Sequence, residues 1–393
     1  GSGRVGGDGV MAKLGEVCDI LNGYAFKSNQ YTTSGVRIIR ISNVQKGYIE
    51  DKSPVYYPCD DENVKKYELK QNDLLISLTG NVGRTALLEE KFLPAALNQR
   101  VSCVRLKEPD KVLKTYLFHL LNSDYFEQQC MKAAEGVAQK NLSPKWLFEY
   151  KIPIYSIERQ KEISNTLDKI DLLIILRKQQ LAKLDELVKA RFVEMFGKLH
   201  KTEYNIKTLD ELCEFIKDGT HQTPTYVDVT EGYKFLSSKD VTSGYIDWSS
   251  IKYISEELHQ ELYKRIAPQR GDILLAKNGT TGIPAIVETD ETFDIYVSLA
   301  LLRLKPNNNV RYIWSALRMP ETKAQFDNSL KGVGVPNLHL GEIKKTKIIV
   351  PPFSLQNQFA TFVEHVDKQK QTMQQSLEKL ELMKKALMQE YFG

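Results

Sequence analysis

The pattern of apolar and polar residues divides the chain into short segments of strand type and two much longer segments of helix type. Apolar or alternating runs bounded by Gly, Asn and Asp predict strands at residues 36–41, 74–78, 101–106, 273–276 and 296–304. Helical spacing of apolar residues occurs over residues 113–132 and 310–326. This mixture predicts α+β globular parts over about residues 12–155 and 204–351.

The two long segments carry apolar residues at alternating spacings of three and four. The first stripe consists of Ile163, Leu167, Ile170, Ile174, Leu181, Leu184, Val188 and Met195. The second stripe consists of Phe359, Val363, Val366, Met373, Leu377, Leu380, Leu387 and Tyr391. Arg177 and Arg191 interrupt the first stripe, and Lys370 and Lys384 interrupt the second. This spacing predicts coiled-coil helices of about 35 to 40 residues each.

The same order of features occurs twice along the chain. Near the start of each copy, Leu14, Glu16 and Cys18 correspond to Leu209, Glu211 and Cys213, 195 residues later. Late in each copy, residues 141–142 and 196–197 correspond to residues 337–338 and 392–393, 196 residues later. A repeat of this length is too long for a solenoid unit and indicates two complete domains. We therefore expect domains at 11–155 and 198–351, followed by helices at 156–197 and 352–393.

Helices this long and this charged are not expected to stand alone in water, so we expect them to pack on each other. If two copies of one unit pair about an approximate two-fold axis, the helices run antiparallel and the domains lie at opposite ends. The cationic interruptions can then lay their stems along the seam and keep their charges in water. The alternative is that each helix is solvated and packs only on its own domain.

Composition sets broad limits on the class of protein. Apolar residues make up 42% of the chain, and 54 basic residues against 50 acidic residues give a net charge of +4, which permits a nucleic-acid partner without requiring one. No apolar stretch approaches the roughly 18 residues that span a bilayer. Residues 1–10 have the composition of an expression scar ahead of Met11, and no secretory signal is present. The five cysteines form no C-x-x-C pair, which favours a reducing cytoplasm over a disulfide framework.

Motifs for catalysis are missing. The sequence Val350-Pro351-Pro352-Phe353 is similar to the tetrad with which amino-methyltransferases hold a target amine, but valine cannot accept the required hydrogen bonds. The two prolines are better interpreted as the entrance to the second long helix. No glycine-rich cofactor loop or phosphate-binding loop follows a strand, and the six histidines show no metal-ligand spacing. We therefore expect no active site, metal site or cofactor in this chain.

Two glycine-containing loops follow predicted strands at equivalent places, at residues 79–84 and 277–282. Their amide, hydroxyl and cationic side chains can bind DNA phosphates or bases, which makes candidates of Thr79, Asn81, Arg84, Lys277, Asn278, Thr280 and Thr281. The alternative is a hairpin turn that needs only a positive φ at glycine. The residues alone leave these two interpretations equally supported.

Other polar loops add amide and cationic groups suited to reading base edges. In the first copy the candidates are Asn22, Tyr24, Lys27, Asn43, Gln45, Lys46, Gln139 and Asn141. In the second copy they are Thr220, His221, Gln222, Ser238, Lys239 and Asn337. His221 lies in a polar loop for which a plain surface turn is an equal alternative. Loops that occupy equivalent places in the two copies but contain different residues are suited to domains that read different DNA sequences.

This combination resembles the specificity subunit (HsdS) of Type I restriction-modification systems. The resemblance spans nearly the whole chain after residue 10 and rests on four features: Lys217-Asp218-Gly219-Thr220-His221, the Asn141-Leu142 and Asn337-Leu338 pairs, residues 348–358, and the closing Phe-Gly pairs. The first copy departs from the usual Pro-Pro helix entrance, because it has Ile152-Pro153-Ile154-Tyr155 at that place.

The resemblance implies a non-catalytic subunit that binds double-stranded DNA and two methyltransferase subunits, and that joins two restriction/translocase subunits for cleavage. It implies that each domain reads one half of a bipartite, asymmetric site, with the coiled coil as a ruler between them. N6-adenine methylation and restriction would be carried out by the partners, which use S-adenosylmethionine, ATP and Mg. The alternative from another class is a protein scaffold that does not bind DNA.

Overall fold

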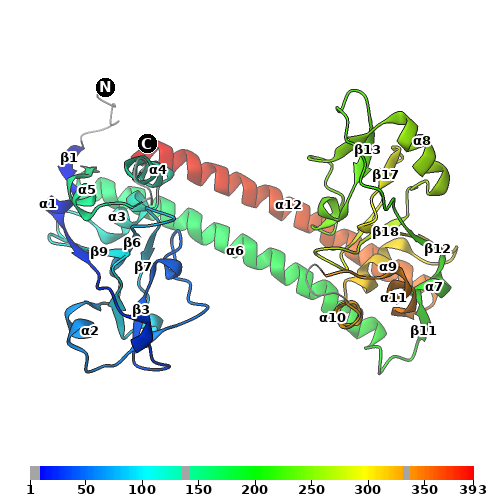
Figure 1. Cartoon of the computed structure of the whole chain (residues 1–393), viewed down its shortest axis with the longest axis horizontal. Coiled ribbons are helices and arrows are strands. Elements are labelled where there is room, and N and C mark those ends of the chain that lie inside the picture. The colour runs from blue at the N-terminus through cyan, green and yellow to red at the C-terminus, as the bar shows by residue number, and fades with distance from the viewer. Residues whose placement is uncertain (1–8, 135–140, 331–335) are drawn as a thin grey trace. The chain divides into compact units, whose positions relative to one another are not determined.

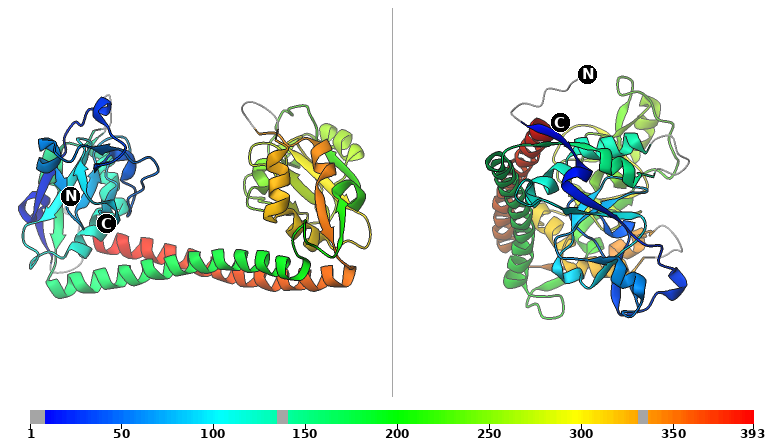
Figure 2. Two further views of the ribbon diagram at one scale, coloured as in Figure 1. Left: turned by 90° about the horizontal axis from the view of Figure 1, so that it is seen from below. Right: turned by 90° about the vertical axis from the view of Figure 1, so that its left-hand side faces the viewer.

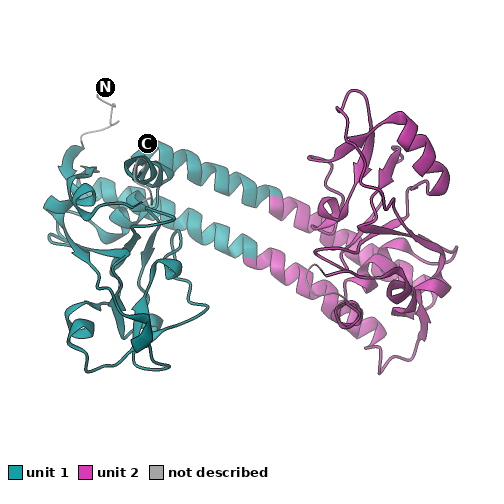
Figure 3. Cartoon of the chain, in the orientation of Figure 1, with its two compact units in different colours: residues 1–178, 375–393 teal, residues 179–374 magenta. Residues whose placement is uncertain are grey.

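The computed structural model describes residues 9–134, 141–330 and 336–393. The chain forms two compact units (Figure 3), which are residues 1–178 with 375–393, and residues 179–374. We call them unit 1 and unit 2. Each unit contains one globular part and a portion of both long helices. Unit 1 is therefore formed by two separate stretches of the sequence, and unit 2 is one stretch that begins within the first long helix and ends within the second.

Unit 1 is built on two four-stranded sheets and one strand pair (Figure 1). The first sheet has the order β2 (Cys18–Asn22), β9 (Val101–Leu106), β6 (Leu74–Ser77), β7 (Thr85–Leu87), and its neighbouring strands are antiparallel. The second sheet has the order β4 (Tyr56–Tyr57), β3 (Val36–Ile39), β8 (Ala95–Leu97), β5 (Glu68–Leu69), with β3 and β8 parallel. β1 (Val10–Lys13) pairs with β10 (Lys151–Ile154).

Unit 2 repeats this arrangement, except that its second sheet has three strands. Its first sheet has the order β12 (Cys213–Asp218), β18 (Leu299–Leu304), β15 (Ile273–Ala276), β16 (Pro284–Ile286). Its second sheet has the order β14 (Lys252–Ile254), β13 (Tyr233–Leu236), β17 (Phe293–Ile295), with β13 and β17 parallel. β11 (Asn205–Thr208) pairs with β19 (Lys347–Val350). The strands predicted from apolar runs are therefore present, and the last of them begins at Leu299 rather than at residue 296.

The first sheet of unit 1 is buried on both faces, which explains the continuous apolar runs in its central strands. Leu74, Ile76 and Val104 belong to the core under the helices. Leu75 and Cys103, which alternate with them along the strands, belong to the core under the second sheet. Successive side chains of β6 and β9 therefore point to opposite faces of the sheet, and the first sheet contributes to two cores.

Short helices cover these sheets. In unit 1 they are α1 (Leu14–Val17), α2 (Glu62–Lys66), α3 (Lys114–Leu121), α4 (Asp124–Ala133) and α5 (Pro144–Glu149). In unit 2 they are α7 (Leu209–Leu212), α8 (Glu256–Arg265), α9 (Val310–Leu317), α10 (Pro320–Asn328) and α11 (Leu340–Lys345). Each region of helical spacing therefore forms two helices. α4 begins after the N-cap Ser123, whose side chain accepts from the Phe126 amide at 3.1 Å, and α10 begins with a proline.

The two long helices are α6 (Ile157–Phe196) and α12 (Phe353–Phe392), and they lie side by side (Figures 1 and 2). They run antiparallel within each unit. In unit 1 Lys178 pairs with Glu381 at 2.9 Å, and Lys384 pairs with Asp171. In unit 2 Lys370 pairs with Asp185 at 2.6 Å. The predicted coiled coil is confirmed, and two of its cationic interruptions form ion pairs with acids of α6.

Both helices also enter the core of each unit. In unit 1 the core contains Ile163 and Leu167 near the start of α6, together with Phe392 at the end of α12. In unit 2 it contains Phe196 at the end of α6 and Phe359 near the start of α12, whose ring centroids lie 5.5 Å apart. The predicted entrance of α12 is confirmed, because β19 ends at Val350 and the helix begins after the two prolines. A helix packed only on its own domain is not what the structure shows.

Within the described residues, no helix is both long and apolar enough to cross a membrane. The same part of the chain contains no group of three or more His, Cys, Asp or Glu residues placed to hold a metal ion. All five cysteines are free thiols, and only Cys59 is exposed.

Candidate nucleic-acid interface

Three polar segments from distant parts of the sequence lie at the same end of the first sheet of unit 1. We call them the strand-end loop (residues 22–27), the glycine hairpin (residues 79–84) and the asparagine segment (residues 141–143). Asn141 bridges to Thr79, and the Leu142 amide donates to the Leu78 carbonyl at 2.7 Å. The Tyr24 amide donates to the Leu97 carbonyl at 2.9 Å. The residues proposed from three separate motifs therefore lie at one end of the first sheet.

The same three segments occupy the equivalent place in unit 2, as residues 218–224, 277–282 and 336–339. Asn337 bridges to Asn278, and the Leu338 amide donates to the Lys277 carbonyl at 2.8 Å. The Thr220 amide donates to the Ile295 carbonyl at 3.1 Å, as Tyr24 does to Leu97 in unit 1. The backbone contacts that hold these segments are therefore the same in both units, although the side chains of the segments differ.

Glycine is required where the strand-end loop passes close to the backbone at the end of β8 in unit 1, and where the equivalent loop passes the end of β17 in unit 2. A Cβ at Gly23 would lie 2.2 Å from the carbonyl oxygen of Asn98, and one at Gly219 would lie 1.9 Å from that of Ile295. The glycine hairpins need positive φ, which is 68° at Gly80 and 75° at Gly279. The hairpin interpretation of these loops therefore describes their backbone, and their exposed tips remain candidates for DNA contact.

In unit 1 the candidates fall into two groups. Asn22, Lys27, Asn81 and Asn141 are exposed, and Tyr24, Gln45, Thr79 and Arg84 are half-buried. Arg84 donates to the Gln45 side-chain oxygen at 2.6 Å, which joins the hairpin to the loop after β3. Lys46 is exposed but pairs with Asp124 at 2.5 Å and Glu127 at 2.7 Å on α4. Gln139 lies outside the described residues.

Asn43 serves the chain itself. It is 4% exposed, accepts from the Arg40 amide at 2.8 Å and donates to the Glu50 carbonyl at 2.9 Å. These bonds close the turn η2 (Ile41–Asn43). An asparagine in a short polar loop can fold back on its own backbone as easily as it can face a ligand, and the sequence alone does not separate these roles.

In unit 2 the exposed candidates are His221, Gln222, Lys239 and Thr280, and the half-buried ones are Ser238, Asn278 and Asn337. Ser238 belongs to the turn η4 (Ser238–Val241), and its amide donates to the Ser298 hydroxyl at 2.9 Å. Thr220, Lys277 and Thr281 are buried, at 7%, 5% and 5% exposure. These three side chains are therefore not available to contact DNA, and they pack beneath the exposed residues of the loops.

The burial of Lys277 is explained by a charge cluster around Asp218. Lys277 Nζ lies 2.8 Å from Asp218 Oδ2, and the Asp218 residue is 8% exposed. His221 Nε2 lies 3.3 Å from the same oxygen, and an Arg265 guanidinium nitrogen lies 3.6 Å from Oδ1. The cluster borders a cavity of about 440 Å³ that is also lined by Asn278, Asn337 and His339.

Some polar residues near the site were not among the sequence candidates. In unit 1 Gln99 and Arg100 are exposed in the turn after β8, and the Gln99 amide donates to the Tyr24 carbonyl at 2.9 Å. In unit 2 Asp218 and His339 line the cavity. The signal for the first pair was present, because Asn98-Gln99-Arg100 is a polar triplet between two apolar strands. The contact of Asp218 with Lys277 spans 59 residues and leaves no local mark.

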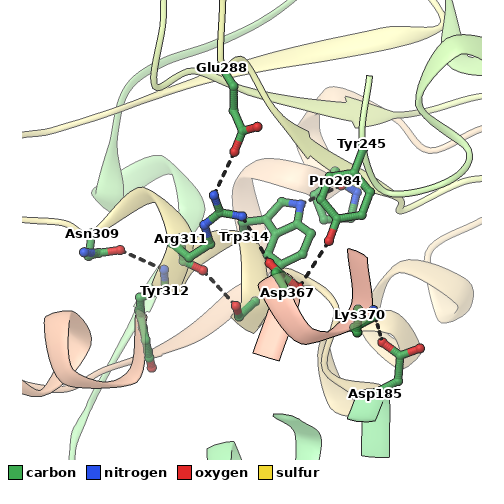
Figure 4. Close-up of polar contacts among 11 residues, drawn as sticks. Asp185, Tyr245, Pro284, Glu288, Asn309, Arg311, Tyr312, Trp314, Asp367 and Lys370 are labelled. Carbon is green, nitrogen blue, oxygen red and sulfur yellow. Dashed lines mark hydrogen bonds and ion pairs between the residues drawn. The ribbon is translucent and has the colours of Figure 1, made fainter. Parts of the chain in front are cut away.

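The globular part of unit 2 is anchored to α12 through Arg311 (Figure 4). Arg311 pairs with Asp367 of α12 at 3.3 Å and with Glu288 at 2.7 Å. Tyr245 donates to Asp367 at 3.3 Å. Burial raises the pKa of Asp367, and it raises the pKa of Tyr245 to about 12. These contacts fix the helix against the globular part that carries the loops.

A family model described as Type I restriction modification DNA specificity domain matches residues 8–186 and 201–382. Among curated proteins, the chain is 25% identical over 391 residues to the Type I restriction enzyme EcoBI specificity subunit of Escherichia coli, a match that covers 91% of this chain and 79% of that protein. It is 31% identical over 191 residues to the MjaVIII specificity subunit of Methanocaldococcus jannaschii, covering 47% of this chain and 44% of the relative.

Solved structures share the fold. The S subunit of the Type I restriction-modification system from M. genitalium matches with a TM-score of 0.55 and 15% identity, over 98% of this chain and 96% of that one. A chain from a structure of Type I R-M complex assembly and conformational transition matches with a TM-score of 0.63 and 16% identity, over 100% and 99%. Because the family model covers both copies of the repeat, the chain belongs to the Type I restriction-modification DNA specificity family and is the non-catalytic specificity subunit of such a system.

Proposed function

We propose that unit 1 and unit 2 each read one half of a bipartite, asymmetric site in double-stranded DNA. The observation that carries this proposal is that both units place three polar segments at the same end of the first sheet, on the same backbone hydrogen bonds but with different side chains. Two domains with the same backbone but different exposed side chains are suited to recognising different base sequences.

The exposed groups are of the types that read DNA. Unit 1 presents Asn22, Lys27, Asn81, Gln99, Arg100 and Asn141. In unit 2 the exposed groups are His221, Gln222, Lys239 and Thr280, and Asn278 and Asn337 are half-buried. Amide and imidazole groups match donors and acceptors on base edges, and cationic groups match phosphates. We infer that Asn43, Thr220, Lys277 and Thr281 act by holding the loops in place.

Methylation of adenine N6 and cleavage would be performed by partner subunits, two for modification and two for restriction and translocation. These partners would use S-adenosylmethionine, ATP and Mg, for which this chain offers no recognisable motif. A docking surface is available on α6, where Leu172, Leu173, Ile175 and Leu176 are between 43% and 56% exposed. Contiguous exposed apolar side chains of this kind are typical of an interface.

We also propose that the antiparallel pair of α6 and α12 sets the spacing between the half-sites. Each helix has 40 residues, which corresponds to about 60 Å at 1.5 Å per residue. Half-sites one turn of DNA apart are separated by about 34 Å, which helices of this length can bridge. The reaction would take place in the cytoplasm, in keeping with the five free thiols.

The test is a genome-wide map of N6-methyladenine in cells that express this chain with its cognate methyltransferase subunit. Control cells express the methyltransferase subunit alone. We expect a split motif that appears only when this chain is present, and that motif names both half-sites. A soluble, assembled complex that produces no new motif would contradict the proposal and favour the scaffold alternative.

A further inference from the structure

Equivalent turns follow β3 in unit 1 and β13 in unit 2, at residues 40–50 and 237–247. We call them the unit 1 turn and the unit 2 turn. The first amide of each turn donates to the side chain of its fourth residue, at 2.8 Å to Asn43 in unit 1 and at 2.6 Å to Asp240 in unit 2. Both turns contain the sequence Val-x-x-Gly-Tyr-Ile and differ in the two residues between Val and Gly. The two turns therefore share one backbone bond and several side chains, but not the residues at their tips.

Both turns contact the candidate nucleic-acid interface. In unit 1 the Gln45 side-chain oxygen accepts from Arg84 of the glycine hairpin at 2.6 Å. In unit 2 the Ser238 amide donates to the hydroxyl of Ser298 at 2.9 Å, and the Ser298 carbonyl accepts from the amide at the start of the equivalent hairpin at 2.8 Å. The unit 2 turn also carries the exposed cation Lys239. The position of each turn therefore affects which of its side chains can reach the DNA.

The unit 2 turn is held against α12 through Tyr245 (Figure 4). The Tyr245 hydroxyl donates to Asp367 at 3.3 Å, and its ring centroid lies 5.8 Å from that of Trp314, which is 1% exposed. Asp367 is fixed in turn, because Arg311 donates to its other oxygen at 3.3 Å and to Glu288 at 2.7 Å. The Asp367 side chain is only 16% exposed, and shielding from water strengthens hydrogen bonds of this kind.

The equivalent tyrosine of unit 1 makes no such contact. Tyr48 is 53% exposed, and its hydroxyl forms no hydrogen bond within the part of the chain that the structure describes. The unit 1 turn is instead tied to α4, where Lys46 donates to Asp124 at 2.5 Å and to Glu127 at 2.7 Å. In unit 2 the place of Lys46 is taken by Ser243, which carries no charge. The two equivalent turns are therefore fixed to different helices by different residues.

We propose that Tyr245 and Lys46 are positioning residues that hold the unit 2 turn and the unit 1 turn in place for DNA, and that Tyr245 acts through Asp367. This inference rests on the proposed function, because it concerns how each unit presents its turn to one half-site. It gives Lys46 a role different from DNA contact. A turn that is already ordered loses less conformational freedom when DNA binds, so its anchor raises the affinity for that half-site.

The proposed role is distinct from a contribution to folding. The Lys46 side chain is 42% exposed, and ion pairs in water add little to stability. The Tyr245 hydroxyl can be removed while its ring remains beside Trp314. We therefore expect the effects of these two anchors to appear in the recognition of one half-site each, with the melting temperature of the chain unchanged.

The experiment uses the full chain assembled with its methyltransferase subunits. Affinity is measured for a duplex with the mapped motif and for duplexes in which one or the other half-site is scrambled, and the ratio of affinities gives the discrimination at each half-site. The variants are Tyr245→Phe and Lys46→Gln, and Tyr48→Phe is the matched control, because it makes the same change in the equivalent tyrosine. Asp367→Ala, alone and combined with Tyr245→Phe, tests the path through α12.

We expect Tyr245→Phe to lower the discrimination at one half-site by about tenfold, as the loss of a hydrogen bond to a charged group does. Lys46→Gln should lower it at the other half-site, and Tyr48→Phe should change neither. Asp367→Ala should reproduce the effect of Tyr245→Phe, and the combined variant should lose no more than either single variant.

Unchanged discrimination in Tyr245→Phe or in Lys46→Gln would overturn the role of that residue, and so would equal losses at both half-sites. An equal loss in Tyr48→Phe would show that the hydroxyl contacts DNA in both units. Additive losses in the combined variant would show that Tyr245 does not act through Asp367. If Asp367→Ala does not fold, the comparison of Tyr245→Phe with Tyr48→Phe still decides the proposal. Failure of the proposed function itself is distinguishable, since the unsubstituted chain would then give no split motif.

Discussion

Gly219 occupies a place in unit 2 that admits no side chain. Its ideal Cβ would lie 1.9 Å from a backbone oxygen of β17, which cannot move without disturbing the second sheet. We expect Gly219→Ala to destabilise unit 2 by about 1–3 kcal/mol, as overpacking does, and to weaken the reading of one half-site. Thermal unfolding of the purified chain and motif mapping measure the two effects.

The matched control for this prediction is Gly341→Ala. Gly341 lies in α11, and a Cβ there would meet no heavy atom within 4 Å. Alanine favours a helix over glycine by roughly 0.5–1 kcal/mol, so this variant should be as stable as the parent chain or slightly more so. Equal stability of the two variants would show that the close approach at Gly219 is not limiting.

Asp294 is a second residue whose role can be measured, through the pH dependence of the stability of the chain. It is 2% exposed, and its Oδ2 lies 2.6 Å from His259 Nδ1, whose ring stacks on Tyr233 at 3.8 Å. Its Oδ1 is buried without a hydrogen-bond partner. Burial raises the pKa of Asp294 to about 6, against an opposing effect of His259.

We expect Asp294→Asn to change how stability depends on pH. Because the pKa of this carboxyl is higher in the folded chain, the folded state binds the proton more tightly than the unfolded state does. Its contribution to stability is complete below about pH 4 and is lost as the pH rises through about 6, by an amount of the order of 1–3 kcal/mol. Melting temperatures measured from pH 4 to 7 for both chains should converge toward low pH if Asn is otherwise tolerated; a constant offset would contradict the assignment.

The candidate site could be predicted from sequence only in part. Loop chemistry identified His221, Asn278 and Asn337, which the structure brings together at one cavity. It could not show that Lys277 faces inward, because the partner that draws it in, Asp218, is distant in sequence. Residue type predicts what a side chain can bind, whereas long-range packing decides whether it is free to bind it.

At the scale of elements, the exposed apolar residues Leu172, Leu173, Ile175 and Leu176 of α6 have polar residues at the equivalent positions of α12. Leu172 and Leu176 of α6 are 56% and 43% exposed, and the equivalent residues of α12 are Lys368 and Thr372. If the proposed methyltransferase partner docks on this face, Leu172→Gln with Leu176→Gln should weaken its binding at least about tenfold, because each buried leucine contributes roughly 1.5–3 kcal/mol. Titration of the purified subunits by calorimetry or native mass spectrometry measures this effect.

The control changes the equivalent positions of the other helix, as Lys368→Gln with Thr372→Gln. These side chains are already polar, so the affinity should stay within a few-fold of the parent value. Equal weakening by the two double variants would show that helix surface polarity in general matters, rather than this apolar face. Unchanged affinity in the leucine variant would place the docking surface elsewhere.

The long helices were predictable in detail because their signal is repeated many times over one period. Single positions of the seam were less predictable. Lys370 and Lys384 were expected to keep their charges in water, whereas they pair with Asp185 and Asp171 across the seam. The register between the two helices decides which charged residues form pairs, and the sequence of one helix alone does not determine this register.

At the scale of the whole molecule, recognition of DNA should depend steeply on salt. Complexes that neutralise six or more phosphates lose about a thousandfold or more in affinity between 50 and 200 mM salt. We expect the assembled complex to show such a loss on a duplex that contains its motif, measured by fluorescence anisotropy. A duplex with both half-sites scrambled serves as the control for non-specific binding. An affinity that hardly responds to salt would favour the scaffold alternative.

The ruler proposal is tested by shortening both helices in register. The seam pairs Asp171 with Lys384 and Asp185 with Lys370, so deleting residues 178–184 together with 371–377 removes one heptad from each helix between these two ion pairs. The apolar positions on either side then keep their spacing, and the exposed leucines of α6 remain. Each helix loses about 10 Å at 1.5 Å per residue.

We expect the matched deletion to shorten the spacer of the methylated motif by about three base pairs at 3.4 Å each, with both half-sites unchanged. Deletion of residues 178–184 alone is the control, and it should abolish assembly because the seam beyond the deletion is then out of register. Altered half-sites with an unchanged spacer would contradict the ruler, since the helices would then influence the reading domains instead of the distance between them. An unchanged motif in the matched deletion would show that the spacing is set by the partner subunits.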